Sequence, residues 1–185
     1  MAATPSMMIP LGSPAPAFTL PDTLSEKKIS LEQSRGRTAT VIMFICNHCP
    51  YVKLLNAELV KVANTYQPKG INFIAISSND AGQYPDDGPE PMKMAAKQLG
   101  YPFPYLYDET QEVAKAYDAA CTPDFFVYDK DLKLAYRGQF DDARPGKDVP
   151  VTGKDIRLAL DALLAGKQVP QEQRPSIGCN IKWKK

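Results

Sequence analysis

The amino-acid sequence predicts an α/β protein, with a central mixed β-sheet flanked by helices on both faces. Two nearly continuous apolar segments, 38–45 and 71–77, are rich in β-branched residues, which is typical of strands buried on both faces of a sheet. Between them, residues 50–66 carry apolar side chains at spacings of three and four, the pattern of an amphipathic helix. A strand, a helix and a strand in this order predict a parallel β-α-β unit.

The rest of the chain supplies elements that complete such a sheet. From apolar periodicity and turn residues we expect a helix over 92–100, a short helix over 109–117, and a β-hairpin of 123–129 with 132–138. A last helix is expected to begin near Thr152, which forms a capping-box pattern with Asp155, and to end at Gly166.

Length and composition predict one globular domain. The chain has 185 residues, of which 44% are hydrophobic and 23% are charged, values that fit a packed core rather than a disordered chain. We therefore expect a single domain over 1–185. Its extended lead-in is the proline-rich segment 1–16, and residues 167–185 form a C-terminal tail.

Charge and hydropathy exclude several classes of partner. The net charge is +1, so no basic excess points to nucleic acid. The longest apolar run, 39–45, is too short to cross a bilayer, and we expect no membrane partner. The N-terminus lacks the basic region of a secretory signal, which favours a cytoplasmic protein, with a mature exported form as the alternative. The oligomeric state is not predicted.

Cys46 and Cys49 flank Asn47 and His48, the only histidine in the chain. The motif lies where the first buried strand ends and the helix begins. Free amide groups and the helix dipole at such a position favour a thiolate on Cys46. Cys49, one turn into the helix, is expected to be the more buried thiol. In this interpretation Cys46 attacks a substrate disulfide, and Cys49 resolves the mixed disulfide.

Three segments carry a resemblance to a known family: MFICNHCPYV at 43–52, CTPDFFVYD at 121–129, and the N-terminal GSPAPAFTLPD with ISLEQSRGR at 12–37. The chain resembles the thioredoxin superfamily, and more closely its TlpA-like and AhpC/TSA-type (redoxin) branch. The resemblance implies a thioredoxin-like fold with an N-terminal extension. It also implies a thiol–disulfide oxidoreductase that exchanges electrons with the thiols and disulfides of protein partners and needs no bound cofactor.

The same resemblance assigns roles around the two cysteines. Thr122 and Pro123 match the Thr–cis-Pro that faces the CxxC, an edge that in the family pairs with the extended chain of the substrate. His48 occupies the spacer position that raises the reduction potential by stabilising the thiolate form. A solvated loop residue is the alternative interpretation of His48.

The group that accepts the proton of Cys49 is open. Thr40 and Val52 stand where related branches often have an acid, so Asp124 becomes a candidate. Three further acids, Asp80, Asp86 and Asp87, belong to a polar loop at 78–91 that we expect to be solvated, with partner recognition as the alternative.

A peroxiredoxin-like thiol peroxidase with an antioxidant role is the alternative function, with Cys46 as the peroxidatic cysteine. Peroxiredoxins resemble Pro-x-x-x-Thr-x-x-Cys at that point, and this chain has Ala39 and Met43 at the Pro and Thr positions. That difference disfavours the alternative.

A metal site is a further alternative, and a redox-inert interaction domain is another. Cys46, His48 and Cys49 could supply at most three ligands, whereas structural zinc sites use four, so no metal is predicted. An interaction domain would not need both cysteines.

Cys121 and Cys179 are the two remaining cysteines. Buried, inert thiols are one interpretation of them. The other is an auxiliary redox role, in which the C-terminal tail folds back and Cys179 pairs with Cys121 or relays oxidation from Cys46.

Overall fold

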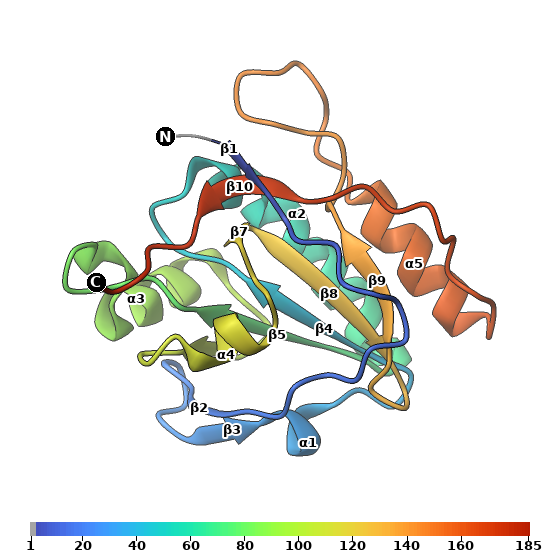
Figure 1. Cartoon of the computed structure of the whole chain (residues 1–185), viewed down its shortest axis with the longest axis horizontal. Helices are drawn as coiled ribbons and strands as arrows, with labels where there is room; N and C mark the ends of the chain where they lie inside the picture. The colour runs from blue at the N-terminus through green and yellow to red at the C-terminus, as the bar shows by residue number, and fades with distance from the viewer. Residues whose placement is uncertain (1–2) are drawn as a thin grey trace.

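The computed structural model describes residues 3–185, and a five-stranded sheet forms its centre (Figure 1). The strand order is β6-β5-β4-β8-β9. The strands are β4 (Ala39–Phe44), β5 (Ile71–Ser77), β6 (Tyr105–Tyr107), β8 (Asp124–Asp129) and β9 (Leu134–Gly138). Strand β4 pairs parallel with β5 and antiparallel with β8. The predicted mixed sheet is confirmed, as are the parallel β-α-β unit and the β8–β9 hairpin.

The hydrophobic core has two layers, one on each face of the sheet, and successive side chains of β4 point alternately into one and the other. Val41 and Met43 point to one face of the sheet, and Ile42 and Phe44 point to the other. Helices α2 (Pro50–Tyr66), α3 (Pro89–Leu99) and α5 (Lys154–Leu164) contribute to the first layer. Helices α1 (Leu31–Ser34) and α4 (Glu112–Ala116) contribute to the second. Helices therefore cover both faces, as predicted, and every residue of β4 is buried.

The start of α5 differs from the expected capping box. Its N-cap residue is Gly153, which has a positive φ of 64° and makes no side-chain cap. The amides of Thr152 and Gly153 instead donate to the Asp141 carboxylate, each over 2.7 Å. A carboxylate from a distant loop therefore replaces the local Thr152–Asp155 pair, and a local pattern could not predict it.

Both ends of the chain take part in a second sheet of order β1-β10-β7. Its strands are β1 (Ala3–Pro5), β10 (Ile177–Asn180) and β7 (Cys121–Thr122). Figure 1 shows β10, in red, beside β1, in dark blue. The C-terminal tail therefore folds back and contains a strand, β10, that pairs with β1 along one edge and with β7 along the other.

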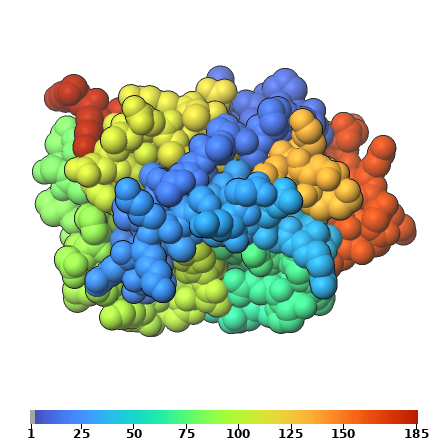
Figure 2. Space-filling view, turned by 90° about the horizontal axis from the view of Figure 1, so that it is seen from below, coloured from blue at the N-terminus to red at the C-terminus, as the bar shows by residue number. Residues whose placement is uncertain are grey.

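The N-terminal lead-in is packed against the body of the protein. Figure 2 shows this segment, in blue, lying across one face between the yellow and orange parts of the chain. The Ala15 amide donates to Leu132 O over 2.9 Å, and Tyr117 Oη donates to Pro16 O over 2.8 Å. A short hairpin of β2 (Thr19–Pro21) and β3 (Lys28–Ser30) follows.

Two single-turn 3₁₀ helices, Gln67–Lys69 and Pro85–Asp87, complete the regular structure, the second in the loop after β5. Within residues 3–185, no helix combines the length and the apolar character needed to cross a membrane.

Candidate active site

The two motif cysteines lie between β4 and α2, but not at the expected helix positions. Helix α2 begins at Pro50, and Cys49 is its N-cap residue. Proline is favoured in the first turn because no backbone donor is needed there. Cys49 therefore takes the position at the helix terminus that we expected for Cys46, and it is not one turn inside the helix. Both thiols are almost fully buried, with exposed fractions of 2% for Cys46 and 0% for Cys49.

The Thr122–Pro123 peptide bond is cis, as the resemblance implies, and it faces both thiols. The Thr122 hydroxyl lies 3.4 Å from Cys46 Sγ. The Cys49 thiol donates to the Thr122 carbonyl over 3.1 Å. A contact across 73 residues of chain thus brings together the four residues Cys46, Cys49, Thr122 and Pro123.

The edge that the resemblance assigns to substrate is occupied by the chain itself. Strand β10 pairs antiparallel with β7, with Cys179 opposite Thr122 and Asn180 opposite Cys121. The expectation of a free substrate edge at Thr122–Pro123 is therefore not met in this structure. The reason is the path of the tail, which returns across the active site instead of extending into solvent.

Cys179 lies beside Cys49 and not beside Cys121. The Cys49 and Cys179 sulfurs are 2.9 Å apart. Cys121 Sγ is directed at Pro123 O, 3.6 Å away. Neighbouring residues of a strand point to opposite faces, so Cys121 and Thr122 project to different sides of the small sheet. Because Cys179 is the register partner of Thr122, its sulfur meets Cys49 in this structure, and the Cys121–Cys179 pair considered from the sequence is not formed.

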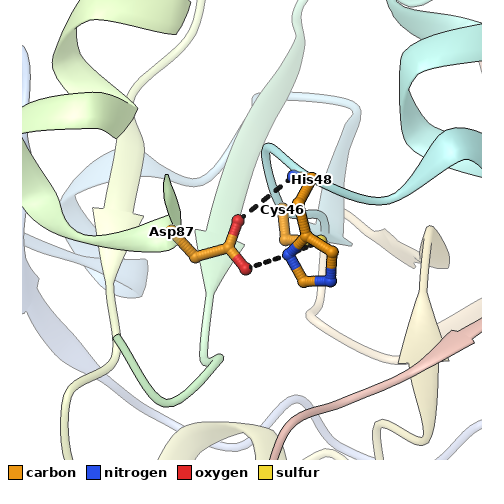
Figure 3. Close-up of side chains that lie close together, drawn as sticks. All are labelled: Cys46, His48 and Asp87. Atoms are coloured by element: carbon orange, nitrogen blue, oxygen red, sulfur yellow. Dashed lines mark hydrogen bonds and ion pairs between the residues drawn. The ribbon is translucent and has the colours of Figure 1, made fainter. Parts of the chain in front are cut away.

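A buried carboxylate, Asp87, organises the spacer of the motif (Figure 3). Asp87 is 0% exposed. It accepts hydrogen bonds from the amides of Asn47 (2.7 Å) and His48 (3.3 Å) and from the Asn79 side chain (2.8 Å). Its second oxygen lies 2.5 Å from His48 Nδ1. The expectation of a solvated loop is therefore wrong for Asp87 and for Asp80, which are both buried, whereas Asp86 is exposed.

His48 is partly buried and held on two sides. Its ring stacks on Tyr84 at a centroid distance of 5.2 Å, and its Nδ1 lies 3.9 Å from Cys46 Sγ. Within the described chain its Nε2 is buried without a hydrogen-bond partner. His48 is thus fixed between the Cys46 sulfur and the Asp87 carboxylate, and the solvated-loop interpretation of this residue is wrong.

Sequence reasoning missed Asp87, although one signal pointed to it. Parallel neighbouring strands end at the same edge of a sheet, so the loop after β5 must lie near the loop after β4. The loop after β5 carries Asp87, and the loop after β4 carries Cys46 and His48. The adjacency of the loops was predictable, but which of the acids would turn inward was not.

The two thiols affect each other's ionisation. The hydrogen bond with Cys49, burial and the nearby Asp87 carboxylate raise the pKa of Cys46. The hydrogen bond from Cys46 lowers the pKa of Cys49 to about 4, against the effect of burial, and the Cys179 thiol and the Val52 amide add to the lowering. Burial and the Asp87 charge therefore oppose the thiolate that we expected on Cys46.

Cys46 and Cys49 have similar exposed fractions, but they differ in whether they line a cavity. Cys46 and Asn47 line a cavity of about 210 Å³, whose other walls come from α2 and α3. Cys49 does not line this cavity, and Thr122 and Cys179 lie against its sulfur. A reactant that enters the cavity meets Cys46 first.

Asp124, the suggested proton acceptor for Cys49, is engaged elsewhere. Its carboxylate lies 3.1 Å from Arg137 Nη2 and accepts a hydrogen bond from the Ala120 amide over 3.3 Å. Burial raises the pKa of Asp124 to about 7, and Arg137 opposes this shift without cancelling it. The contacts of Asp124 give no support to the suggested transfer from Cys49.

Cys46, His48 and Asp87 also form the group best arranged to hold a metal ion in the described chain, with ligand atoms within 4.8 Å of one another. This trio differs from the Cys46, His48 and Cys49 set considered from sequence. The Asp87 oxygens already bind N–H groups, and structural zinc uses four ligands. The geometry fits a hydrogen-bonded Cys–His–Asp cluster better than a metal centre.

Comparison with solved structures identifies the class of fold. The chain is 63% identical to an uncharacterized conserved protein from Geobacillus kaustophilus, with a TM-score of 0.98 over 100% of this chain and 97% of that one. It is 49% identical to a hypothetical protein from Sinorhizobium meliloti 1021, with a TM-score of 0.95 and 98% of each chain covered.

A more distant neighbour is a putative thiol:disulfide interchange protein DsbE from Chlorobium tepidum. It is 18% identical, with a TM-score of 0.68 over 85% of this chain and 99% of that one. This likeness concerns the fold, which is thioredoxin-like as predicted. Residues 11–137 match the AhpC/TSA family, so the chain belongs to that family. No curated protein matches the sequence. Family membership supports a redox function.

Proposed function

We propose that the protein is a thiol–disulfide oxidoreductase that exchanges electrons with the thiols and disulfides of partner proteins through Cys46 and Cys49. The observation that carries the proposal is that both motif sulfurs meet the cis Thr122–Pro123 edge, Cys46 at the Thr122 hydroxyl and Cys49 at the Thr122 carbonyl, while Cys46 also lines a cavity. Membership of the AhpC/TSA family is consistent with it.

In the first step, Cys46 attacks one sulfur of a substrate disulfide and the other substrate sulfur leaves as a thiolate. Cys46 reacts as its thiolate, after its proton has passed to solvent.

In the second step, Cys49 attacks the sulfur of Cys46 in the mixed disulfide. The second substrate sulfur leaves and takes the proton of Cys49. The first substrate thiolate takes up a proton from solvent, so the substrate disulfide gains two electrons and becomes two thiols, while Cys46 and Cys49 become a disulfide. His48, held between Cys46 and Asp87, tunes the potential of this exchange.

Trapping of the mixed disulfide tests the assignment. With insulin as the disulfide substrate, Cys49→Ser is expected to accumulate a mixed disulfide at Cys46, because the resolving thiol is gone. Cys46→Ser is expected to form none and to lose turnover. Cys121→Ser is the matched control, since that thiol is buried and directed at Pro123 O, and it should reduce insulin like the wild type. A mixed disulfide that forms on Cys49 in Cys46→Ser would contradict the assignment.

A thiol peroxidase is the second candidate, favoured by the Thr122 hydroxyl 3.4 Å from Cys46 Sγ. Here Cys46 attacks one peroxide oxygen, the O–O bond breaks, and the other oxygen leaves as water. The resulting sulfenic acid condenses with Cys49 to a disulfide and releases a second water. Ala39 and Met43 in place of the peroxiredoxin Pro and Thr weigh against it. Fast consumption of hydrogen peroxide without insulin reduction would favour the peroxidase.

A further inference from the structure

Cys179 is a buried thiol that the proposed two-cysteine reaction does not use. It is 2% exposed and belongs to the same core cluster as Cys46 and Cys49. It lies 130 residues from Cys49 along the chain, yet the two sulfurs are 2.9 Å apart. A disulfide requires about 2.05 Å, so a small approach of these two sulfurs would allow a bond.

The position of Cys179 is fixed from both sides of β10. Cys179 is the register partner of Ala3 on β1 and of Thr122 on β7. Next to it, Gly178 lies so close to β7 that a Cβ atom there would come within 2.0 Å of Thr122 O. The Ser176 hydroxyl also donates to Pro123 O over 2.7 Å. Cys179 is therefore held against Cys49 by the strand that carries it.

We propose that Cys179 is a third redox cysteine, which exchanges with the Cys46–Cys49 disulfide to give a Cys49–Cys179 disulfide and a free Cys46 thiol. The proposal rests on the proposed function, because that reaction supplies the Cys46–Cys49 disulfide.

The exchange conserves electrons and protons. Cys179 loses its proton and attacks the sulfur of Cys49. The Cys46–Cys49 bond breaks, and Cys46 leaves as a thiolate that takes up one proton. One disulfide is lost and one is formed, so no external oxidant or reductant takes part in this step.

The two disulfides differ in access. All three cysteines are buried, but Cys46 lines the cavity beside α2 and α3, whereas Cys49 and Cys179 do not. An external reductant therefore reaches the Cys49–Cys179 bond by way of Cys46, which attacks Cys49 and reverses the exchange. The protein can thus store an oxidised state while Cys46 is free to react again.

Mapping of disulfides by mass spectrometry tests the exchange. The reduced wild-type protein is treated with oxidised glutathione, the remaining thiols are alkylated, and the linked peptides are identified. We expect both a 46–49 and a 49–179 disulfide, with Cys121 alkylated. A 46–49 disulfide alone, with Cys179 fully alkylated at all times, would overturn the inference and leave the proposed function intact.

Variants in which one cysteine is replaced by serine test the exchange directly. In Cys46→Ser treated with diamide, we expect a 49–179 disulfide that dithiothreitol reduces at least about tenfold more slowly than the wild-type protein, because the route through Cys46 is lost. Two free thiols at 49 and 179 after diamide would overturn the inference. Cys179→Ser should form the 46–49 disulfide alone, whereas Cys121→Ser, the matched control, should form both the 46–49 and the 49–179 disulfide. If the wild-type protein forms the 49–179 disulfide but does not reduce insulin, the proposed function is contradicted and the inference about Cys179 stands.

Discussion

At the scale of single residues, Asp87 sets the surroundings of Cys46. One fully buried carboxylate binds two backbone amides of the motif, the Asn79 side chain and the His48 ring. It therefore holds the spacer in place, and its negative charge opposes a thiolate on Cys46. The Asp87 side chain therefore affects both the position of the motif and the ionisation of Cys46.

Asp87→Asn is expected to lower the pKa of Cys46, because the amide keeps an acceptor for the motif amides but removes the charge. Measured in a Cys49→Ser background at neutral pH, alkylation of Cys46 by iodoacetamide should become several-fold faster. Asp86→Asn is the matched control, since its side chain is exposed, and it should leave the rate unchanged. Equal rates in the two variants would contradict the role of the Asp87 charge.

Asp124 makes stability depend on pH. Burial raises its pKa from 3.8 to about 7, so the folded state binds this proton more tightly than the unfolded state. The resulting stabilisation is complete below about pH 4 and is lost as pH rises through 7. It amounts to about 4 kcal/mol at most, from 1.36 kcal/mol per pKa unit.

Urea unfolding at pH 5 and pH 8 measures this effect. The wild-type protein should be less stable at pH 8, and Asp124→Asn should reduce the difference between the two pH values. Because Asp124→Asn also leaves the buried Arg137 without its partner, it should cost about 3 kcal/mol of stability at pH 8. Asp131→Asn, at an exposed position, is the control. An unchanged pH difference in Asp124→Asn would contradict the assignment.

At the scale of elements, β10 decides what the active site can contact. It pairs with the strand that ends in Thr122, and its Cys179 lies against Cys49. A partner protein that used the Thr122 edge would first have to displace β10. The cavity beside Cys46 is the approach that leaves β10 in place.

Gly178→Ala tests this role of β10. Its Cβ would come within 2.0 Å of Thr122 O, a backbone atom that cannot rotate away. Displacement of β10 should destabilise the protein by about 2 kcal/mol and make Cys49 and Cys179 reactive to iodoacetamide.

Gly82→Ala is the matched control for that variant, because the nearest atom there is a side-chain oxygen of Asp80 at 3.1 Å and not a backbone oxygen at 2.0 Å. It should change neither stability nor thiol reactivity by a measurable amount. If the Cys49 and Cys179 thiols of Gly178→Ala react as slowly as those of Gly82→Ala, β10 does not control access to them.

At the scale of the whole molecule, the two ends of the chain meet over the active site. Strand β1 pairs with one edge of β10, and β7 pairs with the other. The tail is held further by Gln111, which donates to Lys182 O over 2.8 Å, and by Asn79, which accepts from the Lys182 amide over 2.8 Å. Asn79 also binds Asp87, so the loop that orients His48 contacts the C-terminal tail directly.

The sequence by itself determined the central sheet, α2 and the reactive motif. Segments such as 39–44 and 71–77 are apolar throughout, and burial on both faces is the stable state for such a strand. The Thr122–Pro123 edge was also predictable, through its resemblance to a known pattern. The periodicity of apolar residues and the position of prolines act within a single element, so these features can be predicted from the local sequence.

Only the tertiary structure decided which side chains meet Cys46 and Cys49. The inward turn of Asp87 and the pairing of β10 with β7 are contacts between distant segments. No local pattern encodes the path of a tail that begins past 166, and that path assigned Cys179 to Cys49 rather than to Cys121. Such contacts follow from the packing of the whole chain, because a long connection can close over many surfaces at similar entropic cost.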